Sequence, residues 1–423
     1  MNISEIKKSI AAGELDERFS RVYGSASSAQ KERYTGLLND FESIFGGAEV
    51  RFFSAPGRTE VSGNHTDHNH GQVLAAAINL DVIAAVQKTD DDVISVKSRG
   101  FDKMDVVSLT NLMPVEDERT HSAALIRGIA ARFSQLGYNI GGFKAATTSD
   151  VLSGSGLSSS AAFEVLIGTI LNYLYNDGKI SPVEIAQIAQ YSENVFFGKP
   201  CGLMDQMACS VGGFVHIDFE NPAKPVIKPI DFDLAKYGYT LCITDTKADH
   251  ADLTDEYAAI RCEMEQVAGV LNQKCLRDTS EEEFMAKLAE IRKKTSDRAI
   301  LRAMHFYAEN KRVEKAAKAL ANEDIESFKS VILASGASSY QYNQNVNSVK
   351  MKQFQPVGLA LSLSQLVLED KGAWRVHGGG FAGTIQAFVP NAVLDEYIST
   401  LEAVFGKNSV YVLNIRAVGG TEI

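Results

Sequence analysis

The sequence predicts an α+β protein with mixed sheets, organised in two domains. Its 423 residues exceed what one hydrophobic core usually spans. Strand patterns and helix patterns along the chain neither alternate strictly nor segregate into two blocks, which is typical of the α+β class. A turn rich in glycine and serine leads directly into an apolar helix in the first half of the chain. We expect one boundary near residue 220, giving domains 1–220 and 221–423.

The predicted elements follow in chain order. Residues 1–47 read as two or three polar, amphipathic helices, and a β-rich stretch comes next, with its clearest strands at 82–87, 93–97 and 142–148. An apolar helix covers 161–174. Ser181, Pro182 and Glu184 then form a strong helix start, with serine as N-cap and glutamate three residues later. That helix is expected to run to about Phe197.

The second half begins with strands at 213–219 and 239–246. Long helical patterns follow, and the C-terminal part alternates again between strands and helices. The expected helices cover 254–272, 282–307, 310–321, 355–369 and 391–404, and the expected strands cover 384–389 and 409–415.

Composition excludes several classes of function. Hydrophobic residues make up 45% and charged residues 22% of the chain, as in ordinary globular proteins. The net charge of −11 argues against a nucleic-acid partner. No run of about 18 apolar residues predicts a membrane span, and the N-terminal segment has no apolar stretch of the kind found in signal peptides. Five cysteines without CxxC spacing predict free thiols in a reducing cytoplasm.

The turn Gly154–Ser160 is the most informative segment. Glycines let the backbone approach an anion closely, and the helix that follows offers free N–H groups and the positive end of its dipole. No Gly-Lys-Ser/Thr closes the segment, so it is not a Walker A loop. A phosphate site and a plain serine N-cap are equally good interpretations of this turn alone.

A polar loop at 55–71 is the second candidate. It combines Arg58, Asn64 and Asp67 with three histidines between glycines, and polar loops with fixed turns commonly bind ligands. Asn64, His65 and Asp67 could hold the neighbouring hydroxyls of a sugar. A metal site built from His65, His68 and His70 is the weaker alternative, because supporting ligands are missing at useful spacing.

Residues 375–383 contain three consecutive glycines, Gly378–Gly380. The segment formally contains GxGxxG, but no βαβ unit can follow so near the end of the chain. We interpret these glycines as permitting close backbone approach at a domain interface.

These segments, in this order, resemble the galactokinase branch of the GHMP kinases. The family's first motif, Gly-Arg-x-Asn-Leu-Ile-Gly-Glu-His-Thr-Asp-Tyr-Asn, is matched at Gly57, Arg58, Gly63, His65, Thr66, Asp67 and Asn69. The second, Gly-x-Gly-Leu-Ser-Ser-Ser-Ala, is complete at 154–161, and the glycine-rich third lies at 378–383 with Ala382 in place of a glycine. Residues 201–206 are similar to the family's Cys-Gly-Ile-Met-Asp-Gln catalytic segment. The resemblance extends from about residue 30 to residue 420.

The resemblance implies an N-terminal domain like domain 2 of ribosomal protein S5, a ferredoxin-like C-terminal domain, and an active site between them. It implies an ATP-dependent sugar 1-kinase that phosphorylates the anomeric hydroxyl of D-galactose, active as a monomer or weak homo-oligomer without nucleic-acid or membrane partners. Asp205 would be the base and Arg58 its orienting cation, and Ser160 and Glu193 would hold Mg²⁺. The implied ATP-binding residues are Gly154, Ser155, Gly156, Leu157, Ser158 and Ser159, and the implied sugar-binding residues are Asn64, His65, Asp67, Gly202 and Tyr257.

One departure bears on specificity. Asn64 stands where the motif has the glutamate that grips the sugar's 6-hydroxyl, so recognition at C6 is expected to be altered. The alternatives are the same chemistry on a pentose, a uronic acid or an amino sugar, or a non-catalytic sensor of galactose and ATP. Tyr257 lies in a helical pattern and could serve in packing alone.

Overall fold

The computed structural model describes residues 2–47, 49–151, 156–199, 201–248 and 253–423. Gly154 and Ser155, two of the predicted ATP-binding residues, lie outside these ranges. Contacts divide the chain into two units. Unit 1 comprises residues 1–58, 77–213 and 416–423, and unit 2 comprises residues 59–76 and 214–415.

The N-terminal helices of unit 1 confirm the prediction for residues 1–47. They are α1 (Ile3–Ala12), α2 (Asp16–Tyr23) and α3 (Gln30–Phe45). Asn2 and Glu5 cap α1 reciprocally, each side chain accepting the backbone N–H of the other, at 2.9 and 3.0 Å. The apolar faces of these helices form one core cluster with Ile83 and Ala85 of the sheet.

The sheet of unit 1 contains every strand predicted in that region. Its strands are β1 (Arg51–Ser62), β2 (Gln72–Lys88), β3 (Val93–Ser98), β4 (Asp105–Ser108), β5 (Phe143–Ser149) and β12 (Thr421–Glu422). The order is β12-β1-β2-β5-β3-β4, with β3 and β5 parallel and β2 and β5 antiparallel. The sheet is therefore mixed, as the sequence predicts.

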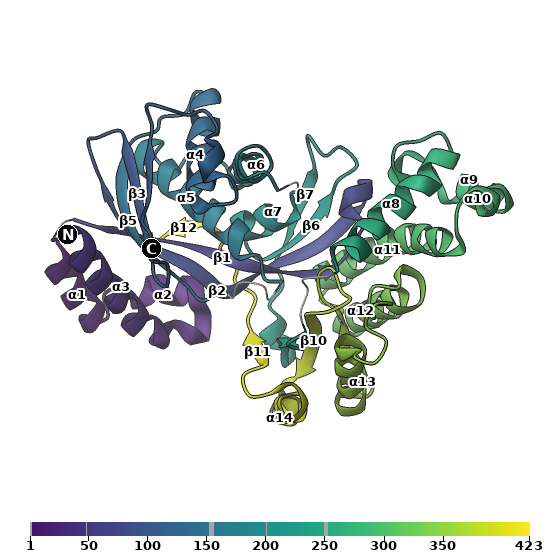
Figure 1. Cartoon of the computed structure of the whole chain (residues 1–423). Coiled ribbons are helices and arrows are strands. Elements are labelled where there is room, and N and C mark those ends of the chain that lie inside the picture. Colours follow the sequence, from purple (N-terminus) through teal and green to yellow (C-terminus); the bar gives the residue numbers. More distant parts are fainter. Residues whose placement is uncertain (1, 48, 152–155, 200, 249–252) are drawn as a thin grey trace. The chain divides into compact units, whose positions relative to one another are not determined.

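Helices cover both faces of this sheet. In Figure 1, α1–α3 lie on one face, and α4 (Ser122–Gln135), α5 (Ser159–Tyr175) and α6 (Pro182–Ser192) lie on the other. The Ser181 hydroxyl accepts the N–H of Glu184 at 3.3 Å, so the predicted cap of α6 is confirmed. The helix then continues as a π-helical turn, η4 (Glu193–Phe197), and ends at Gly198 with φ 85°. After it comes α7 (Met204–Val211).

Unit 2 contains a second, antiparallel sheet. Its strands β8 (Tyr239–Asp245), β9 (Ala373–Val376), β10 (Thr384–Pro390) and β11 (Val410–Leu413) lie in the order β11-β8-β10-β9. The helices α12 (Ile325–Ser338), α13 (Pro356–Leu368) and α14 (Leu394–Phe405) accompany this sheet, and a core cluster joins α13 and α14 to it. Strands β6 (Phe214–Asp218) and β7 (Val226–Ile230) pair with each other, and β6 also pairs with the first residues of β2.

A helical layer forms the rest of unit 2, and here two predicted boundaries are wrong. The helices are α8 (Thr254–Val270), α9 (Glu281–Ala286), α10 (Leu288–Lys294) and α11 (Asp297–Ala321). The predicted helix 282–307 is broken before α11, where Ser296 accepts the N–H of Ala299 at 3.1 Å as an N-cap. The predicted break near residue 308 is absent, because Glu309 and Asn310 are buried inside α11 with polar partners. Helix α12 was not predicted.

The two units are each built from several chain segments, whereas the sequence predicts a single boundary near residue 220. Strands β1 and β2 each continue from one unit into the other, so residues 59–76 group with unit 2. The last residues of the chain return to unit 1, where β12 pairs with β1 at Phe53 and Ser54. The domain limits 1–220 and 221–423 stay a prediction, since contacts alone do not define which segments fold together.

In the described ranges, no helix is long and apolar enough to cross a membrane.

Candidate active site

In unit 1, Arg58 and Asp205 form a two-point ion pair. The Nε and Nη2 atoms of Arg58 donate to Oδ1 and Oδ2 of Asp205 at 2.8 and 2.9 Å. Arg58 ends the unit 1 part of β1, and Asp205 lies in the first turn of α7. Parallel N–H donors facing a carboxylate are the geometry in which arginine binds most strongly and specifically.

The environment of Asp205 keeps its carboxylate ionised. Burial raises its pKa, but the charge and hydrogen bonds of Arg58 and a hydrogen bond from Ser158 outweigh burial and hold the pKa below its usual value. The Asp205 side chain is still 34% exposed. An ionised carboxylate that a ligand can reach is suited to accepting a proton.

The start of α5 is open toward an anion. Ser158 has a left-handed backbone with φ 59°, and its hydroxyl donates to Asp205 rather than capping the helix. Among the residues that the structure describes, no side chain caps the first N–H groups of α5, from Ser159 onward. Arg58 also donates from Nη1 to the carbonyl of Gly156. Leu157 is buried, and its carbonyl accepts the N–H of Arg58 at 3.1 Å.

Ser160 and Glu193 meet beside this helix start. The Ser160 hydroxyl lies 3.5 Å from Oε1 of Glu193, and Nζ of Lys199 lies 3.2 Å from the same oxygen. Glu193 opens the π-helical turn η4, and turns of this kind occur often at functional sites. Lys199 is well exposed, whereas Glu193 is buried, so the carboxylate is fixed and the cation is the movable partner.

Two further residues of this group were missed by the sequence analysis. Nε2 of Gln206 donates to Glu164 at 3.0 Å and to Glu193 at 2.8 Å. Burial, and then the charge of Glu193, raise the pKa of Glu164 well above its usual value. Two signals could have indicated them: Glu164 follows Ser160 by one helical turn within an apolar pattern, and Gln206 directly follows Asp205.

The oxygen atoms of this group fit Mg²⁺. Oε1 of Glu164 and Oε1 of Gln206 are buried without a hydrogen-bond partner in the part of the chain that the structure describes, and Ser160 and Glu193 add two more oxygen ligands. Magnesium binds hard oxygen ligands and takes one or two carboxylates, with water and phosphate completing its shell. The residue types and their spacing are therefore consistent with the predicted metal ligands.

In unit 2, Asn64 is fully hydrogen-bonded by its own unit. Its Nδ2 donates to Oε1 of Glu60 at 3.0 Å and to the carbonyl of Gly378 at 2.7 Å. Its Oδ1 accepts from Asn345 at 2.7 Å and from Ser339 at 3.4 Å. Both donors and both lone pairs of the amide are in use, so a sugar hydroxyl would have to displace one of these partners.

Glu60 and Asn64 exchange the residue types of the family motif. The motif has asparagine at the position of Glu60 and glutamate at the position of Asn64. In this chain the carboxylate and the amide are hydrogen-bonded to each other, and Arg375 donates to the same Glu60 oxygen at 3.2 Å. The pair keeps one carboxylate and one amide but reverses their places.

His65 and Asp67 occupy the turn after Asn64. Nε2 of His65 lies 3.0 Å from the carbonyl of Gly379, and because a carbonyl only accepts, this nitrogen carries the proton. Burial lowers the pKa of His65, so the ring is neutral and Nδ1 is an acceptor. Asp67 begins the short helix η2 (Asp67–Asn69) and is half-buried.

The glycine triplet approaches its neighbours closely, as predicted, and does so inside unit 2. A Cβ at Gly379 would collide with the Tyr257 ring, and one at Gly380 would collide with the Asn345 carbonyl. Tyr257 donates to the carbonyl of Gly380 at 2.9 Å and packs edge-on against Phe381. Packing is thus one role of Tyr257, and its part in sugar binding stays a prediction. Gly202, in unit 1, is exposed just before α7.

The structure does not support the metal site of three histidines. His65 bonds Gly379, and His68 lies against Asn69, with Nδ1 2.9 Å from the amide nitrogen. Among the described residues, the group of metal-ligating type contains His70 with Cys275 and Asp278 instead. The rings of His65 and His68 lie with their centroids 5.8 Å apart, whereas the ring of His70 lies against Cys275.

The chain is similar to known proteins over most of its length. Residues 39–88 match the galactokinase galactose-binding signature, and residues 124–213 match the GHMP kinases N terminal domain. The galactokinase of Glaesserella parasuis is 32% identical over 87% of this chain and 91% of its own length. The galactokinase of Clostridium tetani is 31% identical over 85% of this chain and 89% of its own length.

Solved structures show the same fold. The galactokinase of Lactococcus lactis, complexed with galactose, has a TM-score of 0.78 and 25% identity, covering 92% of this chain and all of that one. The mevalonate kinase of Methanococcus jannaschii has a TM-score of 0.61 at 15% identity over 88% of this chain and 99% of its own, a likeness of fold alone.

The fold and the sequence signatures define a GHMP kinase, an enzyme that transfers phosphate to an alcohol group. Within that class, the chain belongs to the galactokinase family, whose reaction is the ATP-dependent phosphorylation of galactose. The predicted α+β fold, the kinase class and the family resemblance are confirmed.

Proposed function

We propose that this chain transfers the γ-phosphoryl group of ATP to the anomeric hydroxyl of D-galactose, with Asp205 as the base. The observation that carries the proposal is the Asp205 carboxylate itself. It is held ionised by two N–H donors of Arg58 and one hydroxyl, and it remains partly exposed. A non-catalytic sensor would have no use for a carboxylate kept in this state.

Asp205 accepts the proton of the attacking hydroxyl. The sugar oxygen forms a bond to the γ-phosphorus, the bond from that phosphorus to the bridging oxygen breaks, and ADP leaves. Arg58 keeps the carboxylate oriented, and its guanidinium offsets negative charge that grows on the transferred oxygens. A positioned base of this kind contributes roughly 10²–10⁴-fold to the rate.

ATP is assigned to the turn at the start of α5. Gly154, Ser155, Gly156, Leu157, Ser158 and Ser159 would supply backbone N–H groups to its phosphates, supported by the uncapped helix start. Ser160 and Glu193 would hold Mg²⁺, which neutralises phosphate charge when bound. Lys199, now paired with Glu193, would then be released toward solvent or phosphate.

The sugar is assigned to the loop of unit 2, and Gly202 stays a predicted sugar-binding residue. His65 offers a neutral ring with an acceptor nitrogen, and Asp67 a half-buried carboxylate. Asn64 and Tyr257 support this loop through the glycine triplet and are assigned to sugar binding with it. The enzyme would act in the cytoplasm as a monomer or weak homo-oligomer, in galactose metabolism.

A coupled assay of ATP consumption across a panel of monosaccharides tests the proposal. The panel contains galactose, its 6-deoxy analogue, L-arabinose, galacturonic acid and galactosamine. We expect kcat/KM to be highest for galactose. Highest activity on another sugar would reassign the substrate, and no turnover with any sugar, despite binding of galactose and ATP, would favour the sensor.

A further inference from the structure

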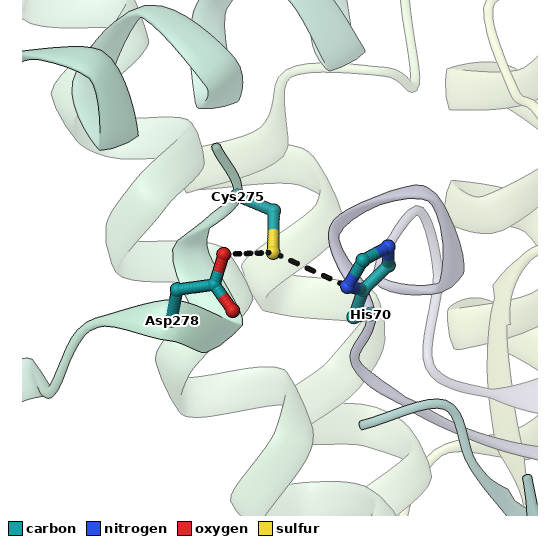
Figure 2. A group of neighbouring side chains, drawn as sticks. All are labelled: His70, Cys275 and Asp278. Atoms are coloured by element: carbon teal, nitrogen blue, oxygen red, sulfur yellow. Dashed lines mark hydrogen bonds between the residues drawn. The ribbon is translucent and has the colours of Figure 1, made fainter. Parts of the chain in front are cut away.

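His70, Cys275 and Asp278 place three metal-binding atoms of different kinds around one point. In Figure 2 the Cys275 sulfur lies between the His70 ring and the Asp278 carboxylate. The sulfur is 3.4 Å from Nδ1 of His70 and 3.3 Å from Oδ2 of Asp278, and all three donor atoms lie within 4.8 Å of one another. All three residues belong to unit 2.

These spacings suit a tetrahedral ion. With zinc bonds of about 2.3 Å to sulfur and about 2.0–2.1 Å to nitrogen or oxygen, two ligands of one tetrahedron stand about 3.3–3.6 Å apart. The two distances that involve the sulfur come close to this range. A small rotation of the side chains would thus be enough to share one ion.

The surrounding hydrogen bonds hold both ligand-bearing segments. The side chain of Asn69 accepts the backbone N–H of Leu276 at 3.0 Å, which ties the turn of His70 to the helix η6 (Leu276–Asp278). Arg277 pairs with Asp218 at 2.9 Å and fixes η6 to β6. His70 itself has φ 62° and donates its N–H to the Asp67 carbonyl at 3.0 Å. These hydrogen bonds therefore fix the backbone segments that carry the three proposed ligands.

We propose that His70, Cys275 and Asp278 form a Zn²⁺ site, separate from the magnesium ligands. A thiolate and an imidazole select zinc over magnesium, whose ligands are oxygens. On binding, the Cys275 thiol loses its proton to solvent and the sulfur bonds the ion. Cys275 is buried and Asp278 is exposed, so a water molecule completes the tetrahedron on the exposed side.

The site would connect the loop proposed for sugar binding to η6. His70 follows Asp67 by three residues in the same turn, so a bound ion would restrain the backbone of residues 65–71. The link between this restraint and sugar binding rests on the proposed function. Zinc binding itself does not depend on turnover.

Zinc chloride titrated into EDTA-stripped, full-length protein by calorimetry tests the proposal. We expect one Zn²⁺ per chain, not displaced by excess Mg²⁺. Cys275→Ser and Asp278→Asn should each weaken binding more than about tenfold, the loss that even a residue supporting a ligand can cause. Cys262→Ser, at an exposed cysteine of α8, is the matched control and should bind as the wild type does.

Cobalt gives a spectroscopic readout that does not depend on activity. Co²⁺ should produce a thiolate-to-metal charge-transfer band that Cys275→Ser abolishes and Cys262→Ser retains. Zn²⁺ should also slow hydrogen exchange in residues 65–71 of the wild type. Zinc affinity that is unchanged by both ligand variants, or cobalt binding without the thiolate band, would overturn the proposal.

Discussion

Oε1 of Glu60 and Nδ2 of Asn64 lie 3.0 Å apart, and this hydrogen bond reverses the carboxylate and amide of the family's first motif. Both residues are buried. Restoring only the family residue at position 64 would therefore place a second carboxylate beside Glu60, to which Arg375 already donates.

The first prediction concerns this pair. Asn64→Glu alone should destabilise the protein by about 3 kcal/mol or more, because two buried carboxylates would then compete for the positive charge of Arg375. Adding Glu60→Asn should recover most of that loss. Urea unfolding of the wild type, both single variants and the double variant gives the coupling free energy.

The double variant also allows sugar specificity to be tested without the loss of stability expected for Asn64→Glu alone. If position 64 contacts C6 of the sugar, the double variant should favour galactose over its 6-deoxy analogue and L-arabinose more strongly than the wild type does. Identical selectivity in the two proteins would place Asn64 outside the sugar contacts.

The second prediction follows from the Ser158 hydroxyl. Its hydrogen bond lowers the pKa of Asp205, so Ser158→Ala should raise that pKa and move the acidic limb of the kcat/KM profile to higher pH. In the wild type this limb should lie below about pH 4, the ordinary pKa of aspartate. Ser159→Ala, the neighbouring hydroxyl, is the control and should leave the limb in place.

The third prediction concerns magnesium. Glu193→Gln should raise the Mg²⁺ concentration needed for half-maximal rate, since one of two proposed protein ligands loses its charge. Glu184→Gln, the same change at a glutamate in the first turn of α6, is the matched control and should keep the magnesium requirement of the wild type. An equal magnesium requirement in Glu193→Gln and the wild type would remove Glu193 from the metal site.

The fourth prediction concerns acid stability. Burial lowers the pKa of His305 from 6.5 to about 4, and its ring bridges the Asn64 carbonyl and the Ser338 hydroxyl at 2.9 Å each. Between these pH values the unfolded chain binds a proton that the folded chain does not. Stability is therefore complete above pH 6.5 and falls as the pH drops toward 4.

Between pH 7 and pH 5, this one group should cost about 2 kcal/mol of stability. His305→Gln should be less stable at pH 7 and should show a shallower dependence of its urea midpoint on pH. Other buried histidines also make stability fall as the pH drops, so some pH dependence of stability should persist in the variant. A slope equal to that of the wild type would show that His305 does not supply this effect.

The sequence predicted local features well and long-range partners poorly. The cap at Ser181, the helix after Ser158 and the strands around residue 85 depend on neighbouring residues, so their patterns were sufficient. The length of α11 was missed because Glu309 and Asn310 look like surface residues, yet their partners come from distant segments. The contact between Cys275 and His70 could not be predicted for the same reason, because the two residues are 205 positions apart in the sequence.

Within the candidate site, the motifs indicated Arg58, Asp205 and Ser158, whose mutual contacts the structure then describes. They did not indicate that the Asn64 amide is occupied by its own unit, because Asn345 and Gly378 are remote in sequence. They also did not indicate Glu164, whose burial beside Glu193 depends on the packing of α5 against α6.

The central claim is that the chain phosphorylates galactose at C1 with Asp205 as base, and product analysis tests it most directly. Galactose and ATP are incubated with the wild type and with Asp205→Asn, and phosphorus NMR resolves the carbon that carries the phosphate. We predict galactose 1-phosphate from the wild type and a rate lower by roughly 10²–10⁴-fold from the variant, with galactose still bound. Phosphate at another carbon, or near wild-type turnover by Asp205→Asn, would contradict the account.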